Sequence, residues 1–338
     1  MADPQRATTI KDVAARLGVS TASVSRALTG MPGVGEPLRE RIRETAREMG
    51  LHTHRPASAM RSKRTRTLGL VVSDVTNPFF AELALTIERA AAARNYSLLL
   101  ANSEDDPEQE SRYLRSMFGH RVEGIVLNPT LRSDHLAYHE EVGVPIVLLD
   151  RAVTTGTSAP VVAVDPDHAI GELVGLFAAT GCRRLAMISG PEDLPNARRR
   201  LRAFEQAAAR HGLQVPKTLI AHGDYTADSG DRLMRHLLRE RVRPDAVFIA
   251  NNLMTLGALR AVRESSVRVP DELSIASFDD VAWFEVTDPP VTAIAQPVVD
   301  LGTAAVRALT DLIAGRPAPS ARIDARLVIR ASCRTPPN

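Results

Sequence analysis

Polar side chains recur in this sequence at or just after short apolar runs, where they could hydrogen-bond a small molecule. Asp74 follows the run LGLVVS, and Asn77, Phe79 and Phe80 follow in TNPFF. The later members of this set are Asp150, Arg151, Arg200, Asn251, Asp279 and Gln296. Carboxylate, amide and guanidinium groups can divide the hydroxyls of a ring among acceptors and donors, while aromatic rings stack on its apolar face. These residue types therefore indicate a site for a small polyhydroxylated ring.

The sequence gives little support to a catalytic function or to a bound cofactor. The sequence has no G-x-S-x-G, no G-x-x-x-x-G-K-[ST] and no G-x-G-x-x-G. Asp150 and Asp279 could form a carboxylate pair, but no nucleophile or metal ligand accompanies them. His135 and His139 are four residues apart without the H-E-x-x-H pattern. We expect a protein that is not an enzyme and that uses no cofactor or metal.

The elements that must position these side chains alternate from residue 67 onward. Apolar runs such as TLGLVVSDV, YSLLLAN and DAVFIANN are separated by amphipathic helical segments. This alternation predicts parallel sheets with helices on both faces. The pattern restarts near residue 163, which predicts two doubly wound lobes with a cleft at the carboxyl ends of their strands. We place the body at 67–338, with one lobe at about 67–164 and 295–322 and the other at about 165–294 and 323–338.

The first 50 residues predict a small all-α unit. Thr9 and Asp12 form a capping-box pattern, Gly18 can end the first helix, and Ser20 can cap the second. A third helix is expected from Pro37 to Met49. Three short helices with tight turns are typical of a helix-turn-helix head, whose second helix enters the DNA major groove. Thr21, Ala22, Ser25 and Arg26 lie away from the apolar stripe of that helix, and Arg26 suits a guanine edge or a phosphate.

Charge supports a polyanionic partner for the N-terminal end. Residues 1–66 carry 13 Lys and Arg against 6 Asp and Glu, whereas the remainder carries 29 against 34. Residues 51–66 are basic and contain little apolar surface, so they are expected to be disordered as an isolated peptide. We assign residues 1–50 to the head and residues 51–66 to a hinge.

The segments TIKDVAARLGVSTASVSRAL and RPASAMRSKRTRTLGLVVSDVTNPFF closely resemble the lactose/galactose-repressor (LacI/GalR) family of bacterial transcription regulators, and the resemblance extends to about Ile329. It implies a hinge that folds into a short helix on operator DNA, where Met60 replaces the usual leucine wedge in the minor groove. It also implies a homodimer on a near-palindromic operator with a central CG step. The DNA-binding candidates are Thr9, Ser20, Thr21, Ala22, Ser25, Arg26, Arg55, Met60 and Arg61.

The body resembles periplasmic sugar-binding proteins of the ribose type. The positions that match the ligand contacts of that type are Asn77, Phe79, Phe80, Asp150, Arg151, Arg200, Asn251, Asp279 and Gln296. The resemblance implies a repressor whose operator affinity is controlled by a sugar-like effector, with a pentose such as ribose as the sharpest guess. A nucleoside or phosphosugar effector, or a protein corepressor, remains an alternative, and a sugar-modifying enzyme is a weaker one. Asn252 departs from the aspartate usual at its position.

The compartment is inferred from what the sequence lacks. It contains no apolar run of about 18 residues and no apolar segment near its start, so neither a membrane span nor a secretory signal is expected. Cys182 and Cys333 stand alone, which fits a reducing compartment better than a disulfide framework. We therefore expect a cytoplasmic protein with no membrane association.

Overall fold

The computed structural model describes residues 8–29, 31–51, 64–130, 136, 142–153, 157–213 and 215–335. The chain divides into two compact units, an N-terminal one at residues 1–65 and a C-terminal one at residues 66–338. We refer to them as the head and the body, and each is described by itself.

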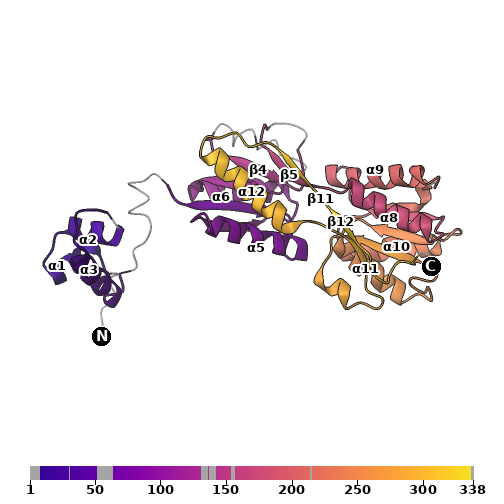
Figure 1. Ribbon diagram of the computed structural model, residues 1–338, viewed down its shortest axis with the longest axis horizontal. Coiled ribbons are helices and arrows are strands. Elements are labelled where there is room, and N and C mark those ends of the chain that lie inside the picture. The colour runs from indigo at the N-terminus through magenta and orange to yellow at the C-terminus, as the bar shows by residue number, and fades with distance from the viewer. Residues whose placement is uncertain are drawn as a thin grey trace. The chain divides into compact units, whose positions relative to one another are not determined.

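The head is a bundle of three short helices, as the sequence predicts (Figure 1). They are α1 (Ile10–Leu17), α2 (Thr21–Thr29) and α3 (Glu36–Glu48). Their shared core is small and consists of Val13, Ala14, Val24, Ala27, Val34, Ile42 and Ala46. The first helix ends at Gly18, whose φ of 65° places it in the left-handed region that glycine tolerates. Because this core is small, most residues on the outer side of α2 do not pack against it.

The helix starts of the head are fixed by short-range hydrogen bonds. The Asp12 carboxylate accepts hydrogen bonds from the backbone N–H and the hydroxyl of Thr9, at 2.7 and 2.6 Å. The Ser20 hydroxyl accepts the backbone N–H of Ser23 at 3.0 Å, so Ser20 caps α2. Gly35 precedes α3 without a side-chain cap. Two of the three helices thus begin at the residues that their sequence signals predicted.

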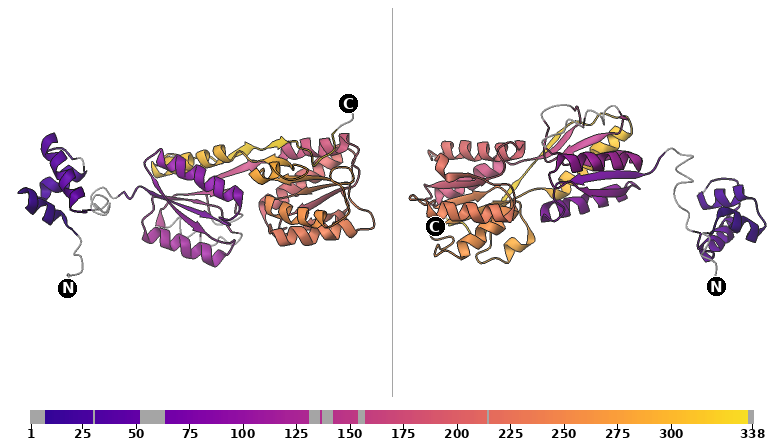
Figure 2. Two further views of the ribbon diagram at one scale, coloured as in Figure 1. Left: turned by 90° about the horizontal axis from the view of Figure 1, so that it is seen from below. Right: turned by 180° about the vertical axis from the view of Figure 1, so that it is seen from behind.

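The body contains two six-stranded sheets with helices on both faces, which confirms the predicted fold class (Figure 2). The strand order is β11-β5-β4-β3-β1-β2 in one sheet and β12-β10-β9-β8-β6-β7 in the other. All neighbours are parallel except β10 and β12. We call the half around the first sheet the first lobe and the half around the other sheet the second lobe.

The first lobe uses residues from both ends of the body. Its strands are β1 (Thr67–Val72), β2 (Ser97–Asn102), β3 (Gly124–Leu127), β4 (Ile146–Leu149), β5 (Val161–Asp165) and β11 (Ala321–Asp324). Its helices are α5 (Pro78–Ala92), α6 (Pro107–Gly119) and α12 (Val298–Ile313). One apolar core joins α5 and α12 to one face of the sheet, and a second core lies on the face that α6 covers.

The second lobe is built around one large apolar core. Its strands are β6 (Leu185–Ser189), β7 (Ile220–His222), β8 (Ala246–Ile249), β9 (Ser274–Phe278), β10 (Thr292–Ala295) and β12 (Arg326–Val328). Its helices are α8 (Asp167–Ala179), α9 (Pro195–Arg210), α10 (Ala227–Arg239) and α11 (Asn252–Arg263), with short 3-10 turns at Lys217–Leu219 and Ala282–Glu285. The chain passes between the lobes three times, after β5, β10 and β11.

A close crossing of α10 and α11 yields a stability prediction. A Cβ atom at Gly257 would lie 1.7 Å from the Ala227 carbonyl oxygen, so the two backbones touch there. Gly257→Ala must push the helices apart, and we expect it to destabilise the body by about 2 kcal/mol. The matched control is Gly171→Ala on α8, where the nearest atom would be the end of a flexible arginine at 3.5 Å. That change should be neutral or slightly stabilising. Urea unfolding of both variants measures the difference, and equal stability would contradict the packing argument.

Candidate functional site

A cavity of about 410 Å³ lies between the two lobes, and we call it the interlobe cavity. All ten sequence-predicted binding residues line it: Asp74, Asn77, Phe79, Phe80, Asp150, Arg151, Arg200, Asn251, Asp279 and Gln296. They come from loops and helix starts that follow β1, β4, β6, β8, β9 and β10. Because parallel strands end at one edge of a sheet, residues distant in sequence meet there.

Asp279, directly after β9, organises one wall of the interlobe cavity. Its Oδ1 accepts a hydrogen bond from Gln296 Nε2 at 2.6 Å. Its Oδ2 accepts two hydrogen bonds from Asn252, from the side-chain Nδ2 at 3.0 Å and from the backbone N–H at 3.3 Å. The residue is only 5% exposed. A buried charge with three donors is fixed in position and available as a charged acceptor.

Two amide side chains connect the lobes across the cavity. Asn252 Nδ2, in the second lobe, donates to Asn77 Oδ1 in the first lobe at 2.9 Å. Asn196 Nδ2, at the start of α9, donates to Asp150 Oδ2 at 3.0 Å. An aspartate at position 252 would keep the backbone N–H donor to Asp279 but would have no side-chain donor for either the Asn77 oxygen or the Asp279 carboxylate. The departure at Asn252 therefore has a structural reason in this chain.

Two buried guanidinium groups and two phenyl rings complete the walls. Arg151 is paired with the Asp105 carboxylate, and Arg200 donates to the Ala250 carbonyl oxygen at 2.7 Å. The Arg200 guanidinium carbon lies 3.6 Å from the centroid of the Phe278 ring, a cation–π arrangement. Phe79 and Phe80 meet edge to face, with ring centroids 5.0 Å apart. Charged donors and apolar rings thus lie in the same cavity.

Backbone strain is concentrated at this cavity. Eight non-glycine residues of the described chain have positive φ, and five of them line the interlobe cavity: Glu104, Asp105, Asp150, Tyr225 and Asp279. Such conformations each cost on the order of 1 kcal/mol and collect where structure serves binding. The strained backbone aims these side chains at the space between the lobes.

Buried polar atoms without hydrogen-bond partners also collect there. Among the described residues, four of the lining side chains have such an atom: Asp150 Oδ1, Arg151 Nε, Tyr225 OH and Gln296 Oε1. An unsatisfied buried polar atom costs about 1–3 kcal/mol, so a cluster of them indicates a polar ligand. The set contains acceptors, a donor and a hydroxyl that can act as either, which is what a polyhydroxylated molecule requires.

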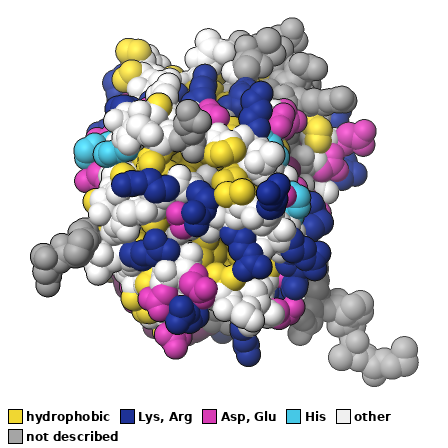
Figure 3. All heavy atoms as spheres, turned by 90° about the vertical axis from the view of Figure 1, so that its right-hand side faces the viewer, with side chains coloured by type: hydrophobic (Ala, Val, Ile, Leu, Met, Phe, Trp, Pro, Cys, Tyr) yellow, Lys and Arg dark blue, Asp and Glu magenta, His cyan; other side chains and the backbone are white. Residues whose placement is uncertain are grey.

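The sign of the net charge on the cavity lining further restricts which ligands can bind. The lining contains six carboxylates, from Asp74, Glu104, Asp105, Asp150, Asp224 and Asp279, against the guanidinium groups of Arg151 and Arg200. The outer face in Figure 3 is different, because basic and acidic side chains are interspersed there with apolar ones. An acidic excess inside a cavity opposes a phosphorylated ligand and favours a neutral one.

The carboxyl of Asp150 provides a test through pH. Burial raises its pKa above the ordinary value of 3.8, and the nearby Arg200 and Arg151 only partly oppose this. The folded state therefore keeps a proton on Asp150 that the unfolded chain releases, so the contribution of Asp150 to stability should fall as pH rises from 3.8 through the raised pKa. Asp150→Asn should flatten this fall. At pH values above the raised pKa of Asp150, the variant should be more stable than the parent.

Thermal unfolding midpoints across the acidic and neutral range measure this effect. Asp228→Asn is the matched control, because the Asp228 side chain is 98% exposed and should not alter the profile. Asp224, Asp231 and Glu272 have lowered pKa values and contribute in the opposite direction, so the difference between the parent and Asp150→Asn isolates Asp150. Identical profiles for the two proteins would refute the assignment.

Sequence reasoning missed several residues of the cavity, among them Tyr225, Asp105 and Asn196. Tyr225 follows β7, a three-residue strand too short to stand out. Asp105 follows β2, and the rule that polar residues collect at strand ends could have found it. Asn196 lies in the first turn of α9, where the sequence drew attention to the arginines instead.

The predicted DNA-binding residues of the head lie at the starts and outer side of its helices. Thr9 and Ser20 cap α1 and α2, Thr21, Ala22 and Arg26 are exposed, and Ser25 is half-buried. Arg55, Met60 and Arg61 lie outside the described residues. Within the described ranges, no cluster of His, Cys, Asp and Glu could hold a metal ion, and no helix could span a membrane.

Comparisons with known proteins cover both units. Residues 9–54 match the family described as bacterial regulatory proteins, lacI family, and residues 174–333 match the periplasmic binding protein-like domain. The HTH-type transcriptional repressor CytR of Escherichia coli (strain K12) is 32% identical over 335 residues, 98% of each chain.

Two solved structures match almost the whole chain. One is a complex of the transcriptional regulator CelR with cellobiose, with 32% identity, a TM-score of 0.73 and coverage of 96% of this chain and 99% of that one. The other is the Lac repressor dimer bound to operator and the anti-inducer ONPF, with 26% identity, a TM-score of 0.87 and coverage of 97% and 99%. Head and body are thus matched together, in one chain.

Proposed function

The chain belongs to the lacI family of bacterial regulatory proteins, a family of DNA-binding transcriptional regulators, and from this premise we propose how it is controlled. We propose that it represses transcription in the cytoplasm and that a neutral sugar-like effector in the interlobe cavity sets its affinity for operator DNA. The effector would contact the ten predicted residues, joined by Tyr225.

The cluster of buried polar atoms without partners carries this proposal. Asp150 Oδ1 and Gln296 Oε1 are acceptors for ligand hydroxyls, while Arg151 Nε is a donor to a ligand oxygen. The rings of Phe79 and Phe80 offer a surface for the apolar face of the ligand. A cavity of about 410 Å³ is at the small end of the range for small-molecule sites, which favours a monosaccharide and in particular a pentose.

The acidic lining favours neutral ligands over the alternatives. A phosphosugar would place its phosphoryl group among six carboxylates. A nucleoside is neutral and hydroxylated, so it remains the second class to screen. The CelR structure contains cellobiose, which supports a sugar for the present chain without specifying which one.

The proposed mode of operator binding is based on the exposed residues of the head. The exposed Thr21, Ala22 and Arg26 on α2 would read base edges, and the hinge would place Met60 as a wedge at a central CG step. The Lac repressor match is a dimer on operator, which supports a homodimer on a near-palindrome here. Two heads on two half-sites would give the symmetry that such operators require.

Control of DNA affinity would be a population shift between two arrangements of the lobes. The Asn252–Asn77 and Asn196–Asp150 hydrogen bonds form only while the lobes are close together. An effector that contacts both lobes favours that arrangement, and its influence is limited to its difference in affinity for the two states.

A thermal-shift screen followed by operator binding tests the proposal. Purified protein is heated with pentoses, hexoses, their phosphates and nucleosides, and a ligand at about 100 times its Kd should stabilise the native state by about 2.7 kcal/mol. The operator is obtained by selecting bound duplexes from a random pool, and its affinity is measured with and without the hit. A neutral sugar that shifts both readings supports the proposal. Silence across the panel, or unchanged operator affinity, refutes it and favours a protein corepressor.

A further inference from the structure

A second cavity of about 370 Å³ lies beside the interlobe cavity, and we call it the arginine cavity. Four guanidinium groups line it, from Arg199, Arg200 and Arg202 on α9 and Arg322 on β11. Its carboxylates are those of Asp150 and Asp167. The excess of charge is therefore opposite in sign to that of the interlobe cavity, although the two share Asp150, Asn196 and Arg200.

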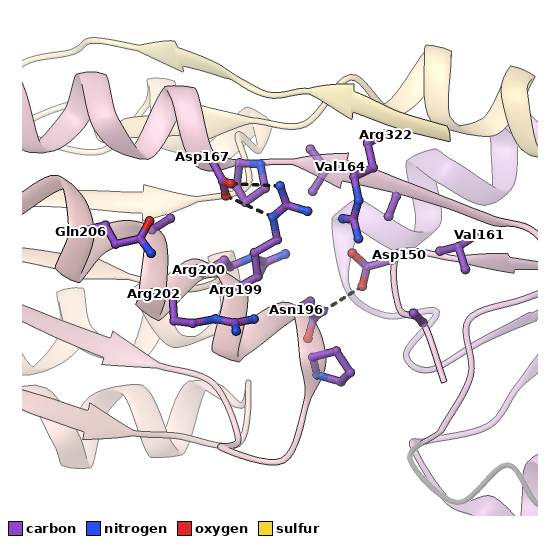
Figure 4. A pocket seen from close by; sticks show the side chains of 15 residues that line it. Asp150, Val161, Val164, Asp167, Asn196, Arg199, Arg200, Arg202, Gln206 and Arg322 are labelled. Carbon is purple, nitrogen blue, oxygen red and sulfur yellow. Dashed lines mark hydrogen bonds and ion pairs between the residues drawn. The ribbon is translucent and has the colours of Figure 1, made fainter. Parts of the chain in front are cut away.

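The arginines of this cavity differ in how their charge is balanced. Arg199 is held by two carboxylates, with Nη2 2.8 Å from Asp165 Oδ2 and Nε 3.0 Å from Asp167 Oδ1. Figure 4 shows its guanidinium turned toward Asp167. Within the part of the chain that the structure describes, no carboxylate pairs with Arg202 or Arg322. Both are exposed at the cavity, so their charge faces an incoming ligand.

The two unpaired arginines come from different lobes. Arg202 lies on α9 of the second lobe, whereas Arg322 lies on β11, which pairs with β5 in the first sheet. In Figure 4 they lie on opposite sides of the space, with the Asn196–Asp150 hydrogen bond beside it. An anion between them would be held by both lobes at once.

We propose that the arginine cavity is a second ligand site, which binds the phosphoryl group of a small phosphorylated molecule or free phosphate. A tetrahedral phosphoryl group has oxygens that point in several directions, so it can accept hydrogen bonds from opposite walls. A carboxylate has only two acceptor oxygens, which lie in one plane, whereas a phosphoryl group has three. Guanidinium forks match phosphoryl oxygens in geometry and charge. This site adjoins the neutral-effector site, with which it shares Asp150, Asn196 and Arg200, and would strengthen the same closed arrangement of the lobes.

Isothermal titration of the full chain tests this site. The titrants are inorganic phosphate and ribose 5-phosphate, in a phosphate-free buffer at constant ionic strength. Parent protein should bind at one saturable site, and Arg202→Gln and Arg322→Gln should each weaken binding by about tenfold, because each removes a charged donor. Arg232→Gln, an exposed arginine on α10 that does not line the cavity, should change nothing.

The two titrants separate the possible sources of the phosphoryl group. Tighter binding of ribose 5-phosphate than of phosphate would mean that the cavity also holds the organic part, while equal affinity would assign it to free phosphate. Binding that is absent, or that is equal in the parent and both variants, overturns the proposal. Thermal shifts by neutral sugars should persist in Arg202→Gln and Arg322→Gln, so a failure of this site is distinguishable from a failure of the proposed effector site.

Discussion

Asp279→Asn is expected to weaken effector binding by about 100-fold, a loss of about 2.7 kcal/mol. The carboxylate uses both oxygens as acceptors, one for Gln296 Nε2 and the other for Asn252. An asparagine keeps the shape but has only one acceptor oxygen. One of these neighbours must then face an NH₂ group, donor against donor, or rotate away.

Either adjustment damages the ligand site itself. Rotation of the Gln296 amide would satisfy the new NH₂ group but withdraw the Oε1 acceptor that lies unpartnered in the interlobe cavity. Displacement of Asn252 would break its hydrogen bond to Asn77 and with it one of the contacts between the lobes. The variant also loses the negative charge that would accept a ligand hydroxyl.

The measurement is a titration of the screened effector against parent and variant, with operator affinity as the second reading. Asp280→Asn is the matched control, because the adjacent Asp280 is paired with Arg330 at 2.7 Å and does not line the interlobe cavity. It should lower stability without altering effector affinity. Equal effects of the two substitutions on effector affinity would show that Asp279 only supports the fold.

The strand-end pattern explains why so much of the interlobe cavity could be predicted. Asp279 and Asn251 follow β9 and β8, two short, fully buried strands whose ends are marked in the sequence by these polar residues. The fold class followed from the same strands and from the periodic helices between them. Local signals of this kind need only the alternation of strand and helix, which the chain displays from β1 onward.

The arginine cavity could not be predicted in the same way. Arg322 belongs to a four-residue strand that is half exposed, and its partner strand β5 lies about 160 residues earlier. Its meeting with Arg202 depends on the last return of the chain to the first lobe. The sequence analysis places about 295–322 in the first lobe, but a hydrophobic pattern does not specify the pairing of β11 with β5, because β11 is too short and too exposed to carry one.

The orientation of the side chains of the ten predicted binding residues could not be predicted from the sequence either. The positive φ of Asp150 and Asp279 determines where their carboxylates point, and no residue pattern predicts this backbone conformation. Asn252 appeared as a departure from the family, yet it is the donor that joins Asn77 to Asp279. Its role depends on two acceptors that only the fold brings together.

In the head, Ala22→Glu is expected to weaken operator binding by at least about 100-fold without unfolding the head. Ala22 is exposed in the first turn of α2, and a carboxylate at a helix N-terminus is favourable for the helix. The same carboxylate would face phosphates and base acceptors if this helix enters the major groove. The substitution is thus expected to stabilise the helix and to weaken operator binding.

Fluorescence anisotropy with the selected operator measures the affinity, and circular dichroism checks the helices. Ala15→Glu is the matched control, since Ala15 is exposed on α1 and the substitution changes net charge by the same amount. The control should lose only the small affinity that long-range repulsion removes, and raising the salt concentration should restore it. The loss at position 22 includes a contact term that salt does not restore. Equal losses in the two variants would mean that α2 does not read the groove, and recognition would then have to be sought in another part of the head.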